Sequence, residues 1–381
     1  MSRLLDKLRS ELRAARSASA VSESRARLSV FYARRGDESE AAVEIAELRS
    51  LANSANLATC TAQANLAEGV LAFCKGNQAE ALDKLRRAKA LAELASSEAL
   101  VRLCLAWLSH VELNLAQTAN IDTQIELILS NARSDEHAAL SRIGMTLAIA
   151  LHTCGRYDLA RPWYELSRQH AVAEGDDLTL DALMHNVAAI RIHNLRLNEI
   201  AEVSDLSELT RAEQELTSGM NYDEVKSPKS YRWMFPLLRI QLLILQKQIN
   251  SARLALEEWF SEHQALALPR ATYLARIDYS YCLSHSNNLK TANEQIEVVA
   301  IEPSTKLDLD DLAFVRFRQS QLAAASHDAG NEQRLLEDAK SLLAKYRTGQ
   351  ASLELARYVH YYYSQNHYKT RVYLQFDSLN P

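Results

Sequence analysis

The sequence predicts an all-α fold, built as a solenoid of stacked helix pairs. Glycine and proline are scarce, with 9 Gly and 6 Pro among 381 residues, which is about 4% where an average chain carries roughly 12%. Ala and Leu dominate the apolar residues and β-branched residues are few, a composition typical of helices and not of sheets. A helix-turn-helix pattern returns about every 40 residues, so the length of the chain needs no division into globular domains.

The repeated pattern is clearest in three segments that align without gaps. They are LSVFYARRGDESEAAVEIAEL at residues 28–48, EGVLAFCKGNQAEALDKLRRA at 68–88 and LAIALHTCGRYDLARPWYELS at 147–167. Each has an apolar helical stretch, a glycine turn and a second helix that opens with a small residue. We expect Gly36, Gly76 and Gly155 to adopt the left-handed conformation, which ends the first helix without steric cost.

A small residue early in the second helix marks the repeat along most of the chain. The marker positions are Ala41, Ala81, Ile121, Ala160, Ala201, Ala252 and Ala292, at intervals of 40, 40, 39, 41, 51 and 40 residues. Two antiparallel helices approach closely only where both surfaces are small, so these positions are expected at helix crossings. The long interval contains the polar stretch SGMNYDEVKSPKS, which predicts an inserted surface loop at residues 218–230. An eighth, weaker unit is expected at residues 310–343.

The two ends of the chain are predicted to cover the array, because a solenoid must shield the apolar faces of its terminal repeats. Residues 1–21 are expected to form a capping helix, since Leu4, Leu8 and Leu12 share one helical face. Residues 349–381 predict a second capping helix and a tail that is unusually rich in aromatic residues. The alternative for this aromatic region is a self-association surface or insertion into a groove.

The repeat resembles that of the tetratricopeptide family over residues 22–348. The family carries a small residue in the middle of the first helix, glycine at the turn and alanine early in the second helix, and Gly69, Gly76 and Ala81 fall on those places. The period here is longer than the family's usual one of about 34 residues, and is similar to the repeats of bacterial regulators and kinesin light chains. The resemblance implies a right-handed superhelix of about eight helix pairs whose first helices line the concave face.

Charge and motif content argue against several function classes. The formal net charge is −5 and no stripe of Lys and Arg occurs, so nucleic acid is not an expected partner. No apolar stretch approaches the length of about 18 residues that suggests a membrane span, and the N-terminus lacks the apolar core of a secretory signal, which favours a cytoplasmic protein. The motifs GxxxxGK[ST], GxGxxG, HExxH and Cys-x-x-Cys are absent, so we expect no cofactor, no metal and no enzymatic activity.

The architecture predicts a scaffold or adaptor that binds a protein or peptide on its concave face. Candidate contact residues on the first helices are Arg142, Asn186, Arg191, Gln241, Asp278 and Tyr281. Asn186 is expected to pair with the backbone of the bound segment. Arg142 and Arg191 are expected to attract its carboxylates.

A second candidate surface lies just after the predicted inserted loop. Trp233 stands there beside Tyr231 and Phe235, and an exposed aromatic cluster would mark a docking site. The alternative function for the whole chain is a ligand- or peptide-responsive regulator, in which a bound peptide alters a signalling or transcription partner.

Overall fold

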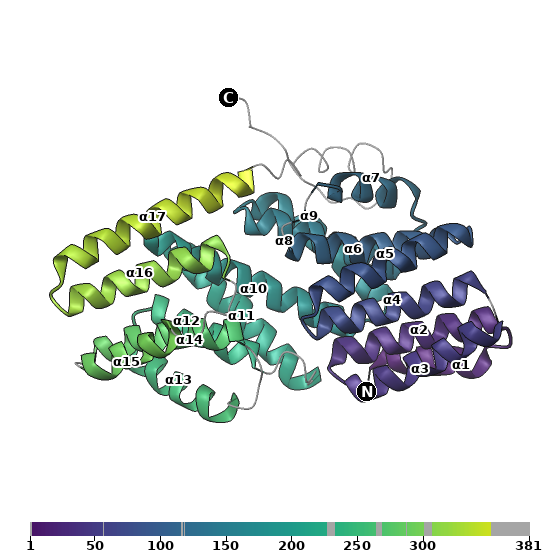
Figure 1. Cartoon of the computed structure of the whole chain (residues 1–381), viewed down its shortest axis with the longest axis horizontal. Coiled ribbons are helices and arrows are strands. Elements are labelled where there is room, and N and C mark those ends of the chain that lie inside the picture. Colours follow the sequence, from purple (N-terminus) through teal and green to yellow (C-terminus); the bar gives the residue numbers. More distant parts are fainter. Residues whose placement is uncertain are drawn as a thin grey trace.

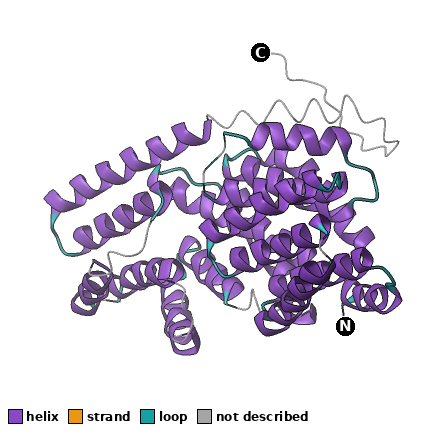
Figure 2. Cartoon of the chain, turned by 45° about the vertical axis from the view of Figure 1, so that its right-hand side comes forward, coloured by secondary structure: helices purple, strands orange, loops and turns teal. Residues whose placement is uncertain are grey.

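The computed structural model describes residues 2–55, 57–115, 117, 119–226, 233–263, 269–286, 288–300 and 307–351. Within these ranges the chain forms seventeen α-helices and no β-strand (Figure 1, Figure 2). The helices are α1 (Arg3–Ala14), α2 (Ala18–Arg35), α3 (Glu38–Ala55), α4 (Ala58–Cys74), α5 (Gln78–Leu94), α6 (Glu98–Asn114), α7 (Ile121–Asn131), α8 (His137–Thr153), α9 (Tyr157–Glu174), α10 (Asp177–Ile200), α11 (Leu206–Lys226), α12 (Met234–Leu245), α13 (Ile249–His263), α14 (Pro269–Ser284), α15 (Leu289–Ala300), α16 (Leu309–Ala325) and α17 (Ala329–Ala351). The predicted all-α class is confirmed for the described part of the chain.

After α1, the helices pack in adjacent pairs. The pairs are α2 with α3, α4 with α5, α6 with α7, α8 with α9, α10 with α11, α12 with α13, α14 with α15 and α16 with α17. Successive pairs also contact each other, for example α2 with α4 and α6 with α8. This arrangement is consistent with the α-solenoid that the sequence predicts.

Small residues lie where the helices of a pair cross. Ala41, Ala81 and Ala160 have no exposed surface. A Cβ atom placed on Gly69 of α4 would lie 2.8 Å from Leu85 Cγ and 3.3 Å from the carbonyl oxygen of Ala81, both in α5. A larger residue at Gly69 would therefore push α5 away, as the marker pattern predicts.

The three predicted glycine turns are confirmed. Gly36, Gly76 and Gly155 have φ angles of 85°, 81° and 74°, in the left-handed region. Because glycine has no Cβ atom, each can reverse the chain there without a clash and let the second helix of the pair begin at once.

The fifth helix pair differs from the sequence prediction. Its first helix, α10, has 24 residues, and Ala201 is the residue that follows the end of α10, not a crossing residue of the next helix. The buried small residue of α11 is Ala212, 52 residues after Ala160 and 40 before Ala252. The extra length of this repeat thus lies in α10, because the segment HNLRLNEI contains no glycine or proline to end the helix.

The predicted inserted loop at residues 218–230 is wrong for residues 218–226, which continue α11 to Lys226. Residues 227–230 lie outside the described ranges. The helix persists through this polar stretch because α12 packs closely against it at Gly219. A Cβ atom at Gly219 would lie 2.7 Å from Cε1 of Phe235 in α12, so only glycine leaves room for this contact. Tertiary packing outweighs the turn-forming composition here.

The predicted N-terminal cap differs in extent from the helix observed. α1 ends at Ala14, and α2 begins at Ala18 after Ser17, whose side chain accepts a hydrogen bond from the backbone N–H of Ala20. At the other end α17 runs to Ala351. The predicted C-terminal cap and the aromatic region from residue 352 onward lie outside the described residues.

Both ends of the described chain pack against α10. At its start, Leu178 packs with Leu4 and Leu8 of α1. At its end, Leu197 packs with Leu343 of α17. Helix α10 is therefore shared by an N-terminal half, α1–α10, and a C-terminal half, α10–α17, as Figure 1 shows.

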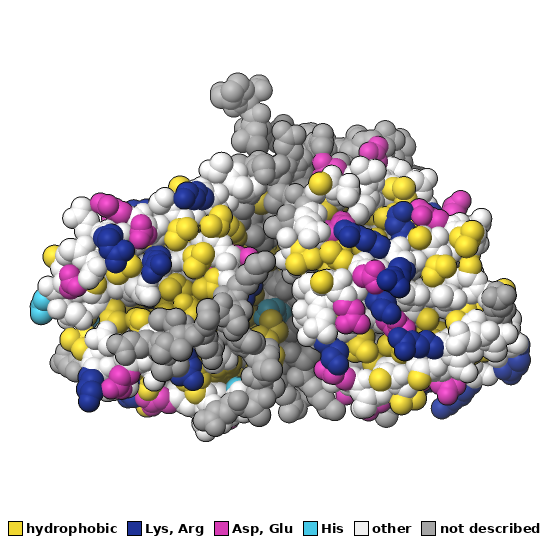
Figure 3. All heavy atoms as spheres, viewed as in Figure 1, with side chains coloured by type: hydrophobic (Ala, Val, Ile, Leu, Met, Phe, Trp, Pro, Cys, Tyr) yellow, Lys and Arg dark blue, Asp and Glu magenta, His cyan; other side chains and the backbone are white. Residues whose placement is uncertain are grey.

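The face of the molecule seen in Figure 3 carries mixed charge. Acidic and basic side chains lie beside one another over the N-terminal half of this face. Ion pairs join neighbouring helices in this half, for example Arg25 of α2 with Glu44 of α3 at 2.6 Å. Charges of both signs balance locally, which agrees with the modest net charge of the chain.

Candidate functional site

The N-terminal half surrounds a chamber of about 640 Å³. Its walls are the inner faces of α2, α4, α6 and α8, and α1 and the α9–α10 turn complete it. Each of the four helices contributes one side chain from an equivalent position of its repeat: Glu23, Gln63, Leu103 and Arg142, spaced by 40, 40 and 39 residues. We name this set the chamber row. It passes from a carboxylate through an amide and an apolar side chain to a guanidinium.

Two members of the chamber row have unused hydrogen-bonding capacity. Gln63 is only 6% exposed, and its Oε1 atom has no hydrogen-bond partner among the described residues. A buried amide oxygen without a donor costs about 1–3 kcal/mol, and a bound N–H group would remove that cost. Glu23 is exposed at the edge of the chamber, where its carboxylate can receive a cationic group.

Arg142 forms the cationic end of the chamber row. Its guanidinium carbon lies 3.9 Å from the centre of the Trp107 ring, in cation–π geometry. Burial, and then the charges of Arg142 and Arg34, hold the pKa of His110 well below its usual value. His110 is thus neutral and shares a 3.1 Å hydrogen bond with the hydroxyl of Thr146. Arg142 thus brings a guanidinium to the chamber wall, the side-chain type that forms charge-assisted hydrogen bonds with carboxylates.

Ion pairs hold the chamber closed against the α9–α10 turn. Lys7 of α1 and Arg27 of α2 both pair with Glu174, and Nη1 of Arg34 lies 2.7 Å from Oδ2 of Asp176. Burial opposes the ionisation of Asp176, but the charge and hydrogen bonds of Arg34 outweigh it and hold the pKa of Asp176 below its usual value. We name these contacts the latch, because they join α1 and α2 to the turn between the fourth and fifth helix pairs.

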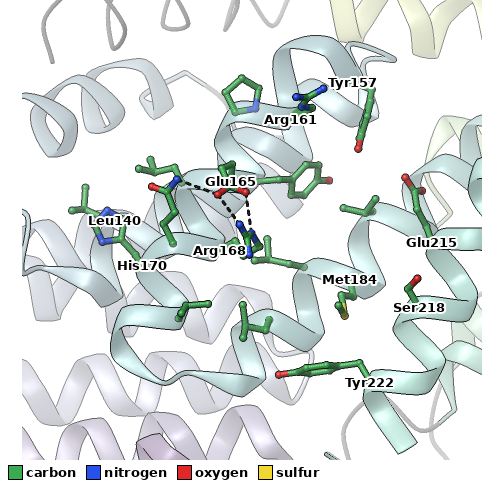
Figure 4. Close-up of a pocket in the computed structure, with 18 of the residues that line it drawn as sticks. Leu140, Tyr157, Arg161, Glu165, Arg168, His170, Met184, Glu215, Ser218 and Tyr222 are labelled. Atoms are coloured by element: carbon green, nitrogen blue, oxygen red, sulfur yellow. Dashed lines mark hydrogen bonds and ion pairs between the residues drawn. The ribbon is translucent and has the colours of Figure 1, made fainter. Parts of the chain in front are cut away.

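A second hollow, the lateral groove, has a volume of about 1190 Å³ and runs between α9 and α11 (Figure 4). Its floor is apolar and comes from α10, with Leu180, Leu183, Met184 and Val187. Apolar side chains of α9 extend this surface on one bank. A hollow of this size exceeds the usual range of about 300–1,000 Å³ for small-molecule sites and suits a polypeptide segment.

Polar groups border the lateral groove on both banks. On α9, Glu165 accepts hydrogen bonds from Arg168 at 2.8 Å and from Gln169 at 3.1 Å (Figure 4). Arg161, on the same bank, is exposed and forms no ion pair with the described residues. On α11, Glu215 accepts two hydrogen bonds from Arg191, at 2.6 and 2.9 Å. The α9 bank thus offers the guanidinium of Arg161, whereas the charge of Glu215 on the α11 bank is balanced by Arg191.

The C-terminal half encloses charged side chains in its interior. Oδ2 of Asp278 in α14 accepts a hydrogen bond from Arg196 of α10 at 2.7 Å, and Nε of Arg318 in α16 lies 3.6 Å from its Oδ1. The Arg318 guanidinium also lies 4.2 Å from the centre of the Tyr281 ring and 3.1 Å from Glu199. The first helices of the fifth, seventh and eighth pairs thus bind one another directly through buried side chains.

The structure separates the residues that the sequence groups into one concave site. Arg142 lines the chamber, whereas Arg191, 3% exposed, joins α10 to α11 through Glu208 and Glu215. Asp278 and Tyr281, 1% and 5% exposed, belong to the buried network of the C-terminal half. Binding by Arg191, Asp278 or Tyr281 therefore requires their internal contacts to break.

The remaining candidates are half-buried and line neither hollow. They are Asn186, Gln241 and Trp233. The carbonyl oxygen of Trp233 accepts a hydrogen bond from the Trp259 indole at 3.1 Å, and Phe235 beside it is buried. Tyr231 lies outside the described residues. Of the predicted aromatic cluster, Phe235 thus serves packing and Trp233 is partly covered.

Sequence reasoning missed Glu23 and the lateral groove. Glu23 could have been found by projecting the interval of about 40 residues back from Gln63, as the repeat rule allows. The groove carries no such signal, because the periodicity of α9 and α10 does not reveal which apolar positions another helix covers. Its existence depends on the spacing between α9 and α11, which is a tertiary property.

One acidic cluster has the residue types of a cation site. Asp308, Asp310 and Asp311 at the start of α16 place one carboxylate oxygen each within 4.8 Å of one another. Arg270 pairs with Asp311, and Nε2 of His193 lies 3.0 Å from Asp310. The charge of Arg270 and the positive end of the helix dipole both favour acidic side chains at this helix start without a bound cation.

Three buried histidines predict a loss of stability in acid. Burial lowers the pKa of His185 to about 4, and burial together with the charge of Arg191 lowers that of His152 to about 3; His110 is shifted in the same direction. The unfolded chain, with a histidine pKa near 6.5, binds these protons first as the pH falls. The stability that neutral imidazoles contribute is therefore lost below about pH 6.5, at about 1.4 kcal/mol per pH unit for each.

When the pH falls from about 7.5 to about 5.5, the free energy of unfolding should decrease in both the parent and a His152→Gln variant. We expect the decrease to be about 1.4 kcal/mol smaller in the variant. Glutamine can keep a hydrogen bond to the Tyr164 hydroxyl, which lies 3.1 Å from His152 Nδ1, and it does not titrate. The measurement is urea unfolding at three pH values. A His327→Gln variant, changed at an exposed site, is the control, and identical pH slopes for all three proteins would contradict the assignment.

No helix within the described ranges combines the length and the apolar character needed to cross a bilayer. No protein-family model and no curated protein sequence matches the chain.

Proposed function

We propose that the protein is a non-enzymatic scaffold or adaptor that binds a protein or peptide segment in the chamber of its N-terminal half. The observation that carries the proposal is the chamber row. It offers a carboxylate, an amide oxygen without a partner, an apolar side chain and a guanidinium, in that order, across four neighbouring helices. This order of groups complements an extended peptide with a basic group at one end and a carboxylate at the other.

Each group in the chamber row has a role in this proposal. Gln63 accepts a hydrogen bond from a backbone N–H of the bound segment. Leu103 packs on one of its apolar side chains. Arg142, held against Trp107, forms a charge-assisted hydrogen bond to a carboxylate, and Glu23 receives a lysine, an arginine or an N-terminal amine. The ion pairs of the latch hold the walls in place before binding, which reduces the entropy cost of association.

The repeat family belongs to the same proposal. We propose that the helix pairs are eight tetratricopeptide-like repeats in a right-handed superhelix, and that the protein acts in the cytoplasm without nucleic acid or a cofactor. Support comes from the buried small residues Ala41, Ala81 and Ala160 at the crossings and from the left-handed glycines at the turns. Local balance of acidic and basic side chains supports a protein partner over a nucleic acid.

A ligand-responsive regulator is the second candidate, and the latch is the observation that favours it. Lys7, Arg27 and Arg34 tie the first two helices to the α9–α10 turn beside the chamber. A peptide whose carboxylates compete for these cations would loosen the contact of α1 and α2 with the α9–α10 turn. The change would reach a partner as a change in the shape of the N-terminal half.

The proposal predicts that reversing one charge in the chamber row weakens partner capture. We expect Glu23→Arg to reduce recovery of the native partner at least tenfold, equivalent to about 1.4 kcal/mol, because a repulsive cation replaces the carboxylate that receives the basic end of the segment. The measurement is affinity purification from the native host followed by quantitative mass spectrometry. Since Glu23 is exposed, the substitution should leave the fold intact.

The matched control is Glu126→Arg, the same charge reversal at an exposed site on α7, which is expected to recover the partner at parental yield. Equal recovery with the two variants, both folded, would contradict binding in the chamber. A captured peptide, in place of a protein, would favour the regulator over the adaptor.

A further inference from the structure

The lateral groove exposes apolar side chains that no other described helix covers. Val172 on the α9 bank is 47% exposed, and Met184 and Val187 on the α10 floor are half-buried. They face one hollow together with side chains of α11 (Figure 4). Removing apolar surface from water is favourable, so a segment that fills the groove is stabilised there.

Helix α17 runs toward this groove. Nζ of Lys340 lies 2.8 Å from a carboxylate oxygen of Glu202, just beyond the end of α10. Seven residues later, Arg347 donates a hydrogen bond to Asn198 at 3.0 Å. Along α17, contacts therefore move from the end of α10 back toward its middle, so the two helices are antiparallel and α17 points to the part of α10 that forms the groove floor.

The last turns of α17 pack on the end of α10. Tyr346 lies against the cluster of buried side chains that includes Leu197 and Ile200. Tyr157, the first residue of α9, lines the groove. The described chain thus ends in a helix that packs on α10, the same helix that forms the groove floor.

The chain beyond α17 is long enough to occupy the groove. Val187 lies eleven residues before Asn198 on α10, a distance of about 16 Å at 1.5 Å per residue. About five extended residues cover that distance at about 3.3 Å each. The 30 residues 352–381 therefore reach the groove with most of their length still available to fill it.

The composition of this segment matches the groove. It contains six tyrosines, one phenylalanine and four leucines. Tyrosine joins a large apolar ring to a hydroxyl, and it suits sites with an apolar floor and polar banks. Arg161, Gln169 and Ser218 on the banks can bond to tyrosine hydroxyls, and Arg161 can also stack on a ring.

We propose that residues 352–381 dock in the lateral groove of the same chain, with their aromatic and aliphatic side chains on the α10 floor. The segment then covers α9, α10 and α11 and connects the end of the C-terminal half to the N-terminal half. This contact uses a different surface from the chamber, so it goes beyond the proposed function and stands independently of it.

Site-specific photo-crosslinking of the full-length chain tests the proposal. A benzophenone amino acid replaces Val172 on the groove bank, and cross-linked peptides are identified by mass spectrometry after irradiation of a mixture of isotope-labelled and unlabelled protein. We expect cross-links from position 172 to residues 352–381 of the same chain. The matched control replaces Leu254, an aliphatic residue of α13 that is 56% exposed and lines neither hollow, and it should give at least tenfold fewer such links.

A second variant tests the groove itself. Met184→Lys places a charge on the apolar floor and should lower the yield of cross-links from position 172 to residues 352–381 at least tenfold. Links that join labelled to unlabelled chains would overturn the proposal in favour of a second copy as the occupant. Links only to other proteins, or equal yields from positions 172 and 254, would overturn it as well.

Discussion

Replacing Asp278 with alanine is expected to lower the free energy of unfolding by about 3–5 kcal/mol, because the change leaves two buried guanidinium groups without a shared counter-charge. Asp278 is 1% exposed and lies between Arg196 and Arg318, which are 5% and 1% exposed. Its two oxygens face these arginines at 2.7 and 3.6 Å. Loss of the carboxylate should also loosen the packing of α10 against α14 and α16.

The measurement for Asp278→Ala is chemical denaturation followed by circular dichroism. Asp135→Ala is the matched control, since its side chain is 69% exposed and pairs with Arg133 at 3.1 Å on the surface. Exposed pairs of this kind contribute at most about 1 kcal/mol. Equal losses in the two variants would show that the interior network adds no more stability than a surface ion pair.

The second large effect is expected at a helix crossing. Ala81→Arg should destabilise the protein by about 3 kcal/mol or more, because a long cationic side chain replaces a methyl group at a site with no exposed surface. The backbone of Ala81 already lies close to Gly69, as the 3.3 Å distance from a Cβ placed there to the Ala81 oxygen indicates. The two helices must separate to admit the new side chain.

Thermal and urea unfolding of Ala81→Arg should be compared with those of Ala90→Arg. Ala90 belongs to the same helix, α5, and is exposed, so the control introduces the same residue with the same helix propensity. Changes at such surface sites are usually within about 0.5 kcal/mol. If the Ala81→Arg protein is as stable as the control, Ala81 does not lie at the helix crossing.

The fold was predictable where short-range steric rules decide the structure. Ala41, Ala81 and Ala160 must be small because two helices meet there, and the sequence shows this directly as an interval near 40 residues. The rule failed at Ala201, which keeps the interval by coincidence but directly follows the end of α10 instead of lying inside the second helix of the pair. The segment HNLRLNEI contains no glycine or proline that would end a helix. The lack of a helix-ending residue therefore predicted the length of α10 better than the interval between the small residues did.

The candidate site was less predictable, because it depends on contacts between distant segments. Arg142 lines the chamber, but Arg191 binds Glu208 and Glu215 of the following helix. A charged residue on a first helix can face a ligand or a neighbouring helix, and a helical period does not distinguish the two. Likewise, Asp278 is buried because α16 packs against α10. This contact joins residues far apart in the sequence, as the hydrogen bond from Arg318 to Glu199, 119 residues earlier, shows.

The position of α10 changes how the molecule responds to local unfolding. In a linear repeat array each unit touches only its neighbours, so an end unit can open while the rest remains folded. Here Leu178 at the start of α10 packs with α1, and Leu197 near its end packs with α17. Opening at either terminus therefore also removes contacts from the middle of the chain. We expect such an opening to cost more free energy than the opening of an end unit in a linear array.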